Sequence, residues 1–359
     1  MTPRTKPLTL QSIQVLRGLA AVGVIAFHCG TILAQTGGEV LFAGVTAFGK
    51  LGVNLFFLLS GFIILKAHAA DIGHPSNLPR YAFRRLARIY PIYWIVLTVN
   101  IAVSSTGLGD PDFSWAPENL ASAYALLPLT PELSLPLKVA WSLFYEIRFY
   151  LLFAIALLSG RLALVLATVW LAAILGAAVL GLTDPLELLS PWNLYFLAGM
   201  GICWLSERMA ARHAPLLLVG GIAVILAFVG FGSLDSINTD GVTATTFWFL
   251  PAFSLLLLGA VLLEPKMGQA PPVLLFLGDA SYSIYLVHTS AISVLALLAN
   301  RLGLIETAGG YGFFVFALVF AVSAGSAVYL LVERPLLAAL SPLTPRRAVS
   351  PVGQETGKA

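Results

Sequence analysis

The chain has 359 residues, of which 58% are hydrophobic and only 10% are charged, and its formal net charge is +3. A soluble globular domain carries about 25% charged residues, so this composition and a mean hydropathy of +0.90 exclude a water-soluble protein. The near balance of positive and negative residues gives no reason to expect a nucleic-acid partner.

Apolar runs of about 20 residues, the length an α-helix needs to cross a bilayer, recur along the whole chain. The sequence lacks the short segments of alternating polarity that are typical of an outer-membrane barrel. We therefore predict an all-α, polytopic membrane protein in which residues 1–340 form one transmembrane domain and residues 341–359 a short, disordered cytoplasmic tail. Ten transmembrane helices are expected, near 12–34, 46–67, 90–106, 136–158, 161–181, 190–206, 214–231, 244–263, 276–299 and 312–332.

The positively charged residues indicate how the chain is oriented in the membrane. An even number of crossings puts both termini on one side, and that side holds Arg4, Lys6, Lys66, Arg80, Arg84, Arg85, Arg88, Arg161, Arg208, Arg212, Lys266, Arg334, Arg346, Arg347 and Lys358. The opposite side has only Lys138 and Arg301, with Lys50 near its edge. Because cytoplasmic loops are enriched in Lys and Arg, both termini are predicted to be cytoplasmic.

The first expected span contains "LRGLAAVGVIAFHCG", residues 16–30, with Arg17 and His28 inside the apolar run. Eleven helical residues turn the chain about 20° beyond three full turns and rise about 16 Å, so the two side chains share one face. Arg17 then lies toward the cytoplasmic side and His28 in the outer half. Lipid phosphate or a neighbouring helix would explain either residue alone, but ionisable residues inside a membrane indicate a functional role.

The second span, "GKLGVNLFFLLSGFIIL", carries Asn54 and Ser60 among glycines that allow neighbouring helices to approach closely. Helix packing explains Ser60 better than a role as a covalent nucleophile does. Because both side chains are polar and lie inside an apolar span, we also consider Asn54 and Ser60 as candidate lining residues of a cavity between helices.

An arginine-rich segment, "LPRYAFRRLARIYPIYW", precedes the third span on the cytoplasmic side. Arg84 and Arg88 are four residues apart and Arg85 and Arg88 are three apart, so on a helix they form one patch. Guanidinium groups bind phosphate oxygens through paired hydrogen bonds. The patch fits a phosphate-bearing ligand, but lipid headgroups and topology signalling also explain such clusters, and the residues alone favour this second interpretation slightly.

The fourth span, "AWSLFYEIRFYLLF", runs inward and holds Glu146 and Arg148. Counting residues places Glu146 at about the depth of His28, where a carboxylate would fix the imidazole tautomer and raise its basicity, as a general base requires. A Glu146–Arg148 ion pair is disfavoured because residues two apart on a helix point away from each other. Arg148 is expected to be structural or to line the same cavity.

The ninth span includes "DASYSIYLVHTS", which puts Tyr282, Tyr285 and His288 inside the membrane. These side chains either line a polar cavity or complete a hydrogen-bond network, and the residues alone do not decide between the two. No metal site is predicted, because the sequence has no HExxH motif and Cys29 and Cys203 stand singly in apolar runs.

Together these stretches resemble the acyltransferase-3 family of bacterial membrane acyltransferases. The matching motifs are, in chain order, Arg17-x10-His28, "GVNLFFLLSGFII" at 52–64, "RRLARIYPIYW" at 84–94, "WSLFYEIRFYLL" at 141–152, "SYSIYLVH" at 281–288 and "VERPL" at 332–336. They occur in the family's order from the first span to the last, so the resemblance covers nearly the whole chain.

The resemblance implies a ten-helix enzyme that transfers an acyl group, often acetyl, from cytoplasmic acyl-CoA to a hydroxyl, commonly on a cell-envelope or exported glycan. His28 matches the family's essential histidine, Arg17, Arg85 and Arg88 match its critical arginines, and Glu146 matches the acidic residue of the fourth-span motif. Acyl-CoA is then a co-substrate, with no tightly bound cofactor. The expected location is the bacterial cytoplasmic (inner) membrane, and the oligomeric state stays open.

A mechanism follows from the residues and the resemblance together. The phosphates of CoA would bind Arg17 and the patch formed by Arg84, Arg85 and Arg88. His28 would deprotonate the acceptor hydroxyl for attack on the thioester, with Glu146 stabilising the imidazolium. An acyl-His28 intermediate is the variant, and the oxyanion donor stays open between Arg148, Asn54, Ser60 and a backbone N–H.

Two other classes of function compete with an acyltransferase. A proton-coupled transporter would use His28 and Glu146 as a proton relay, with Arg17 pairing with the transported solute. A non-catalytic scaffold or lipid-binding protein is the weakest alternative, because it leaves the polar residues inside the spans unexplained.

Overall fold

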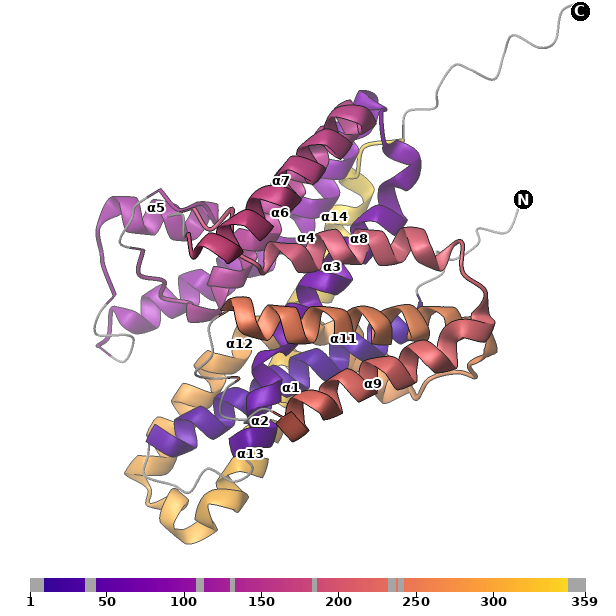
Figure 1. Ribbon diagram of the computed structural model, residues 1–359. Helices are drawn as coiled ribbons and strands as arrows, with labels where there is room; N and C mark the ends of the chain where they lie inside the picture. The colour runs from indigo at the N-terminus through magenta and orange to yellow at the C-terminus, as the bar shows by residue number, and fades with distance from the viewer. Residues whose placement is uncertain are drawn as a thin grey trace, which may run out of the picture.

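The computed structural model describes residues 10–35, 43–107, 113–129, 133–182, 186–231, 237 and 242–347. Throughout these ranges the regular structure is helical, without a strand, and helix follows helix along the chain (Figure 1). The prediction of an all-α protein is therefore confirmed.

The long helices match the ten expected spans. They are α1 (Gln11–Gln35), α3 (Gly52–His68), α4 (Leu78–Ser104), α6 (Trp141–Leu158), α7 (Gly160–Leu180), α8 (Asn193–Ser206), α9 (Ala214–Phe231), α11 (Val242–Leu263), α12 (Pro272–Arg301) and α13 (Leu304–Val328). In the described part of the chain, nine helical stretches are long and apolar enough to cross a membrane, and α8 is a shorter apolar helix. The polytopic architecture is thus confirmed. The shorter elements include α2 (Ala43–Lys50), α5 (Pro117–Ala125), the π-helical turn Tyr329–Glu333 and α14 (Arg334–Leu340).

Helix α4 begins earlier than the sequence suggested. It starts at Leu78, not near residue 90, so the arginine-rich segment is the first part of the third crossing. Pro79 stands in the first turn, where a helix tolerates proline because that N–H has no intrahelical partner. Pro91 lies inside the helix and did not end it. The arginines therefore stand on the first turns of a continuous helix that leads into the bundle.

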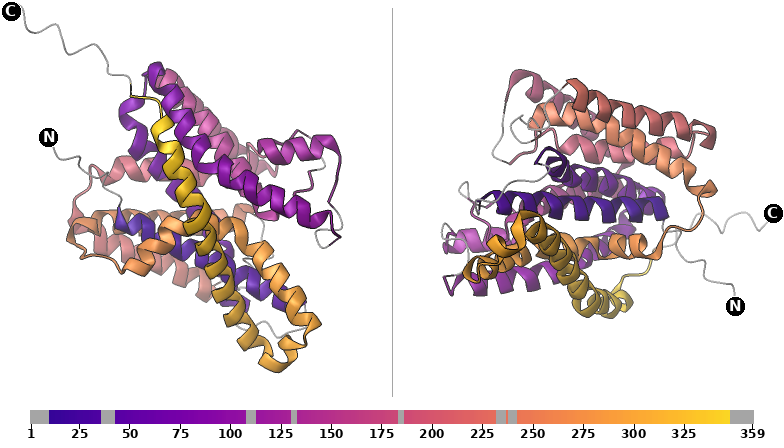
Figure 2. Two further views of the ribbon diagram at one scale, coloured as in Figure 1. Left: turned by 180° about the vertical axis from the view of Figure 1, so that it is seen from behind. Right: turned by 90° about the horizontal axis from the view of Figure 1, so that it is seen from below.

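Helix α1 lies at the centre of the bundle. It packs against α12, α13, α3 and α2, and Figure 2 shows α12 and α13 along one side of α1 with α9 and α11 on the other. Glycines allow the closest approaches: a Cβ on Gly278 of α12 would overlap the backbone carbonyl of Gln14, and one on Gly52 would lie 2.6 Å from the carbonyl oxygen of Ala20. The helix that carries Arg17 and His28 is therefore held on several sides.

The contact between α3 and α8 depends on Gly199, where a Cβ would overlap the carbonyl oxygen of Leu58. Replacing Gly199 with alanine is expected to lower the free energy of unfolding by about 1–3 kcal/mol, because α8 must move away from α3. Gly201→Ala on the same helix is the matched control, since a Cβ there has nothing within 4 Å and alanine is the better helix former. Thermal unfolding in detergent measures both variants, and an equal loss of stability for the two would contradict this role of Gly199.

Contacts between helix ends agree with the alternating direction of the crossings. At the start of α1, the backbone N–H groups of Gln11 and Ser12 donate to the Glu264 carboxylate at 2.6 and 2.9 Å, just beyond the end of α11. At the ends of α3 and α8, Lys66 Nζ lies 3.0 Å from Glu207 Oε1. All of these are helix ends that the charge pattern assigns to the cytoplasmic side.

The C-terminal segment returns to the end of α3. After α14 comes a short 3-10 turn, Ser341–Leu343. Arg347 then binds Asp71: its Nη2 lies 2.8 Å from Asp71 Oδ1, and its Nε donates to the same oxygen at 3.0 Å. Because this carboxylate anchors the chain, residues 341–347 are not disordered as the sequence suggested. Residues 348–359 of the expected tail lie outside the described residues.

Candidate active site

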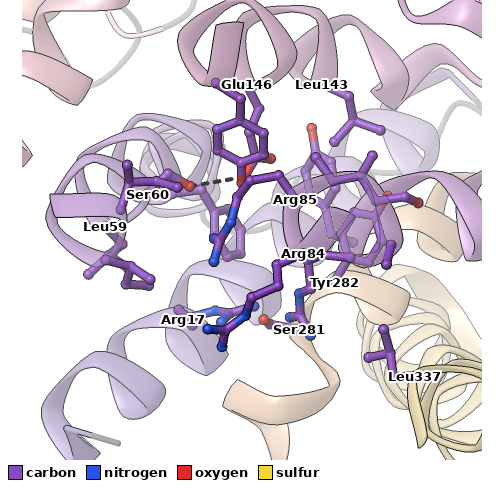
Figure 3. A pocket seen from close by; sticks show the side chains of 18 of the residues that line it. Arg17, Leu59, Ser60, Arg84, Arg85, Leu143, Glu146, Ser281, Tyr282 and Leu337 are labelled. Atoms are coloured by element: carbon purple, nitrogen blue, oxygen red, sulfur yellow. Dashed lines mark hydrogen bonds between the residues drawn. The ribbon is translucent and has the colours of Figure 1, made fainter. Parts of the chain in front are cut away.

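A cavity with strong positive charge opens among α1, α3, α4, α6, α12 and the C-terminal segment. We call it the arginine cavity, and its volume is about 430 Å³. The charged side chains of its lining are Arg17, Arg84, Arg85, Arg88 and Glu146. Figure 3 shows Arg17, Arg84 and Arg85 extending into one space from two different helices. With four guanidinium groups and one carboxylate, the cavity is suited to a ligand with several negative charges.

Aromatic rings and a buried carboxylate hold two of these arginines in place. The Arg85 guanidinium lies 5.8 Å from the ring centre of Tyr150. The Arg88 guanidinium lies 5.9 Å from the ring centre of Tyr282, and its Nη1 is 3.4 Å from Glu333 Oε1. Glu333 is fully buried, and its other oxygen accepts a hydrogen bond from Ser283 at 2.5 Å. The glutamate of the "VERPL" motif thus orients Arg88, a role that sequence reasoning missed.

Glu146 belongs to the arginine cavity and not to the surroundings of His28. Its Oε1 accepts a hydrogen bond from Tyr150. The same oxygen accepts a hydrogen bond from Ser60 at 3.2 Å (Figure 3). The predicted pairing of Glu146 with His28 is therefore wrong. Counting residues predicted how deep Glu146 lies along α6 but not which helices α6 packs against. These helices are α3, α4, α7 and α8.

His28 lines a second cavity, which we call the histidine cavity. Its volume is about 280 Å³, and its lining includes Asn54, Lys50, Lys138, Trp141, Trp192 and Thr245. The rings of Trp141 and Trp192 lie 4.6 Å apart. These aromatic faces beside amide, hydroxyl and ammonium groups form a lining of the kind that binds polar organic ligands. Lys50 and Lys138 are two of the three cations that the sequence assigned to the outer side, so the cavity lies toward that side.

The ring next to His28 is that of His288. The two ring centroids are 5.0 Å apart, with 48° between the ring planes. His288 is fully buried in α12, whereas His28 is partly accessible. The structure thus brings together two histidines that lie far apart in the sequence.

Two side chains separate the cavities. Val53 and Tyr285 line both the arginine cavity and the histidine cavity. The Tyr285 hydroxyl donates to the Val139 carbonyl at 3.2 Å and lies 2.8 Å from Ser142 Oγ, so its ring is fixed across the boundary. Val53 and Tyr285 therefore form the shared boundary of the two cavities.

Of the other predicted residues, three line one of the two cavities, and Arg148 and His288 line neither. Ser60 and Tyr282 line the arginine cavity, and Asn54 lines the histidine cavity. Arg148 lines neither, because its guanidinium lies 4.4 Å from the ring centre of Tyr145 and its Nε donates to the Phe144 carbonyl at 3.2 Å. Of the two roles expected for Arg148, these contacts fit the structural one and not the cavity-lining one.

Sequence reasoning missed much of the histidine cavity. Trp192 and Thr245 come from α8 and α11 or their edges, and neither carried a polar motif that would have marked it. Tyr285, by contrast, was expected beside Tyr282 and His288 on the same span, and it lines both cavities. Among the described residues, no group of three His, Cys, Asp or Glu side chains could hold a metal ion.

The sequence is similar to known acyltransferases over most of its length. A family model described as an acyltransferase domain matches residues 10–330. The exopolysaccharide production protein ExoZ of Rhizobium meliloti (strain 1021) is 33% identical over 300 residues, which cover 80% of this chain and 90% of ExoZ. Acyltransferase MdmB of Streptomyces mycarofaciens is 26% identical over 378 residues, 94% of this chain and 93% of MdmB. No solved structure matches the chain. The chain therefore belongs to the acyltransferase-3 family of membrane acyltransferases.

Proposed function

We propose that the protein transfers an acetyl group from cytoplasmic acetyl-CoA to a hydroxyl of a cell-envelope or exported glycan, with His28 as the general base. One observation carries this proposal: the arginine cavity and the histidine cavity approach from opposite ends of the bundle and share Val53 and Tyr285 as their boundary. Donor and acceptor can therefore meet inside the protein while each enters from its own side of the membrane.

The donor would bind in the arginine cavity. Coenzyme A carries several phosphate groups at one end and the acyl thioester at the other. Arg84, Arg85 and Arg88 lie on the cytoplasmic part of α4 and would bind the phosphates through paired hydrogen bonds. The flexible thioester arm would then extend past Tyr282 toward Tyr285 and Val53, which places the acyl carbonyl next to the histidine cavity.

The transfer step needs a base and a route for one proton. His28 would remove the proton from the acceptor hydroxyl as its oxygen attacks the thioester carbonyl, and a tetrahedral oxyanion would form. The C–S bond would then break, and the leaving CoA sulfur would take up the proton from the His28 imidazolium. Asn54 lines the same cavity and is buried, and we assign its side-chain amide to the oxyanion.

The acceptor would occupy the histidine cavity. The paired rings of Trp141 and Trp192 offer apolar faces to a sugar ring, and Lys50, Asn54 and Thr245 offer polar groups to its substituents. ExoZ, a relative, is named as an exopolysaccharide production protein, which supports a glycan acceptor.

Glu146 would act in the donor cavity and not as the partner of His28. It is the one carboxylate among the described residues that line this cavity, and it stands with Ser60 and Tyr150. It would balance part of the arginine charge and fix Tyr150, on whose ring Arg85 lies. The excess of Lys and Arg on one side supports cytoplasmic termini, and family membership supports the bacterial inner membrane as the location.

The test is acyl transfer by the purified protein in proteoliposomes. The protein is incubated with acetyl-CoA labelled in the acetyl group and with oligosaccharides from bacterial exopolysaccharides and envelope glycans. Labelled, base-labile ester on an oligosaccharide, with release of one CoA per ester, is the expected result. Uptake of a solute that remains chemically unchanged, without ester formation, would favour the transporter and contradict the proposal.

A further inference from the structure

His288 is held in one defined tautomer. Its Nδ1 lies 2.5 Å from the backbone carbonyl oxygen of Tyr285, one turn earlier on α12. A carbonyl oxygen only accepts hydrogen bonds, so Nδ1 carries the proton. In the neutral imidazole the other nitrogen, Nε2, then has a free lone pair and acts as an acceptor.

This acceptor nitrogen is buried without a partner. Nε2 of His288 has no hydrogen-bond partner among the described residues, although the side chain is fully buried. A buried polar atom in this state is unusual, because its desolvation is not compensated. The ring beside it is that of His28, at a centroid distance of 5.0 Å. Two imidazoles joined by an N–H···N bond of about 2.9 Å have centroids about 5 Å apart, so the spacing suits a direct hydrogen bond.

The described lining of the histidine cavity contains no carboxylate that could orient His28. The titratable or charged side chains that line its cavity are Lys50 from α2, Lys138 from the segment before α6, and Tyr285 from α12. Among the described residues of this lining there is no carboxylate. A histidine that acts as a base normally has an acceptor on its second nitrogen, which fixes the tautomer and the ring orientation.

We propose that His288 is the positioning residue for His28: its Nε2 accepts the N–H of one His28 nitrogen, so that the other nitrogen faces the acceptor hydroxyl with a free lone pair. This inference rests on the proposed function. When His28 takes the proton of the hydroxyl, the hydrogen bond to His288 becomes charge-assisted and stabilises the imidazolium. His288 itself stays neutral, because its Nδ1–H remains bonded to the Tyr285 carbonyl. The bond forms by rotation of the His28 ring, since catalytic hydrogen bonds often tighten only when substrate is bound.

Two variants test this role. His288→Gln keeps an acceptor near the position of Nε2, whereas His288→Phe keeps a ring of similar size and removes the acceptor. We expect His288→Phe to lower kcat for acetyl transfer by about 10- to 100-fold, with an unchanged KM for acetyl-CoA because the arginine cavity is intact. The midpoint of its pH–rate profile should move to lower pH by about one unit. His288→Gln should keep the wild-type midpoint and restore most of kcat.

A second measurement is independent of donor and acceptor. Diethyl pyrocarbonate modifies neutral imidazoles, and peptide mass spectrometry reports the modification of His28 separately from that of the other histidines. In His288→Phe the rise of His28 modification with pH should move in the same direction as the kinetic midpoint. If His288→Phe does not fold, His288→Leu serves in its place. If the variant without the acceptor showed the same pH profile as the wild-type protein in both assays, the inference would be overturned. Absence of acetyl transfer in the wild-type protein would contradict the proposed function instead.

Discussion

Replacing His28 with alanine is expected to lower the rate of acyl transfer by about 10³-fold while leaving CoA binding intact. General-base catalysis contributes about 10²- to 10⁴-fold. Among the described residues that line the histidine cavity, His28 is the one histidine. CoA binding should be unchanged because His28 does not line the arginine cavity. Steady-state transfer of labelled acetyl groups measures the first effect, and calorimetric titration with CoA measures the second.

Cys29→Ala is the matched control for His28→Ala. Cys29 is the next residue on α1 and is fully buried in the core, and it lines neither of the two cavities. The variant alters the same helix but removes no group from the site, so it should keep most of the transfer rate. Equal activity of His28→Ala and Cys29→Ala would remove His28 from the mechanism.

Replacing both Arg85 and Arg88 with glutamine is expected to weaken CoA binding by about 100-fold, and either change alone by about 10-fold. A hydrogen bond to a charged group contributes about 1.5–3 kcal/mol, and 1.4 kcal/mol corresponds to a factor of ten in affinity. Calorimetric titration with CoA measures the effect directly. Affinity of the wild-type protein should also fall as salt is raised, because the contacts are ionic.

Arg161→Gln is the control for the arginine pair. Arg161 lies at the start of α7, on the same side of the membrane, but outside the arginine cavity. Its replacement removes a charge from the side predicted to be cytoplasmic without touching the proposed phosphate contacts. If Arg161→Gln weakened CoA binding as much as Arg85→Gln, the effect would come from the general surface charge, and the cluster would be a topology signal only.

The sequence was sufficient for the features that are local to one helix. A run of about 20 apolar residues makes a crossing whatever surrounds it, so the ten spans could be predicted. The spacing of Arg17 and His28 on α1 could be predicted for the same reason, because helical geometry fixes it. The start of α4 was missed, since Arg80 to Arg88 lowered the apolar signal of a helix that begins at Leu78.

Relations between helices could not be predicted in the same way. The depth of Glu146 along α6 gave no information on which helix it would face, and it faces Ser60 of α3. His288 and His28 are both single histidines in apolar runs, and only the packing of α1 against α12 makes them neighbours. Lateral packing depends on glycine contacts such as Gly278 against Gln14, which no single segment reveals.

The central claim is that a donor bound among the arginines reaches His28 through the protein. The measurement is alkylation of His28 by bromoacetyl-CoA in sealed vesicles of known orientation, read by peptide mass spectrometry; the imidazole nitrogen displaces bromide from the bromoacetyl carbon. The account predicts rapid labelling of His28 when the reagent is supplied on the side of Arg85 and Arg88, little labelling from the other side, and protection by free CoA. Labelling at equal rates from both sides, or none at His28 while CoA binds normally, would contradict it.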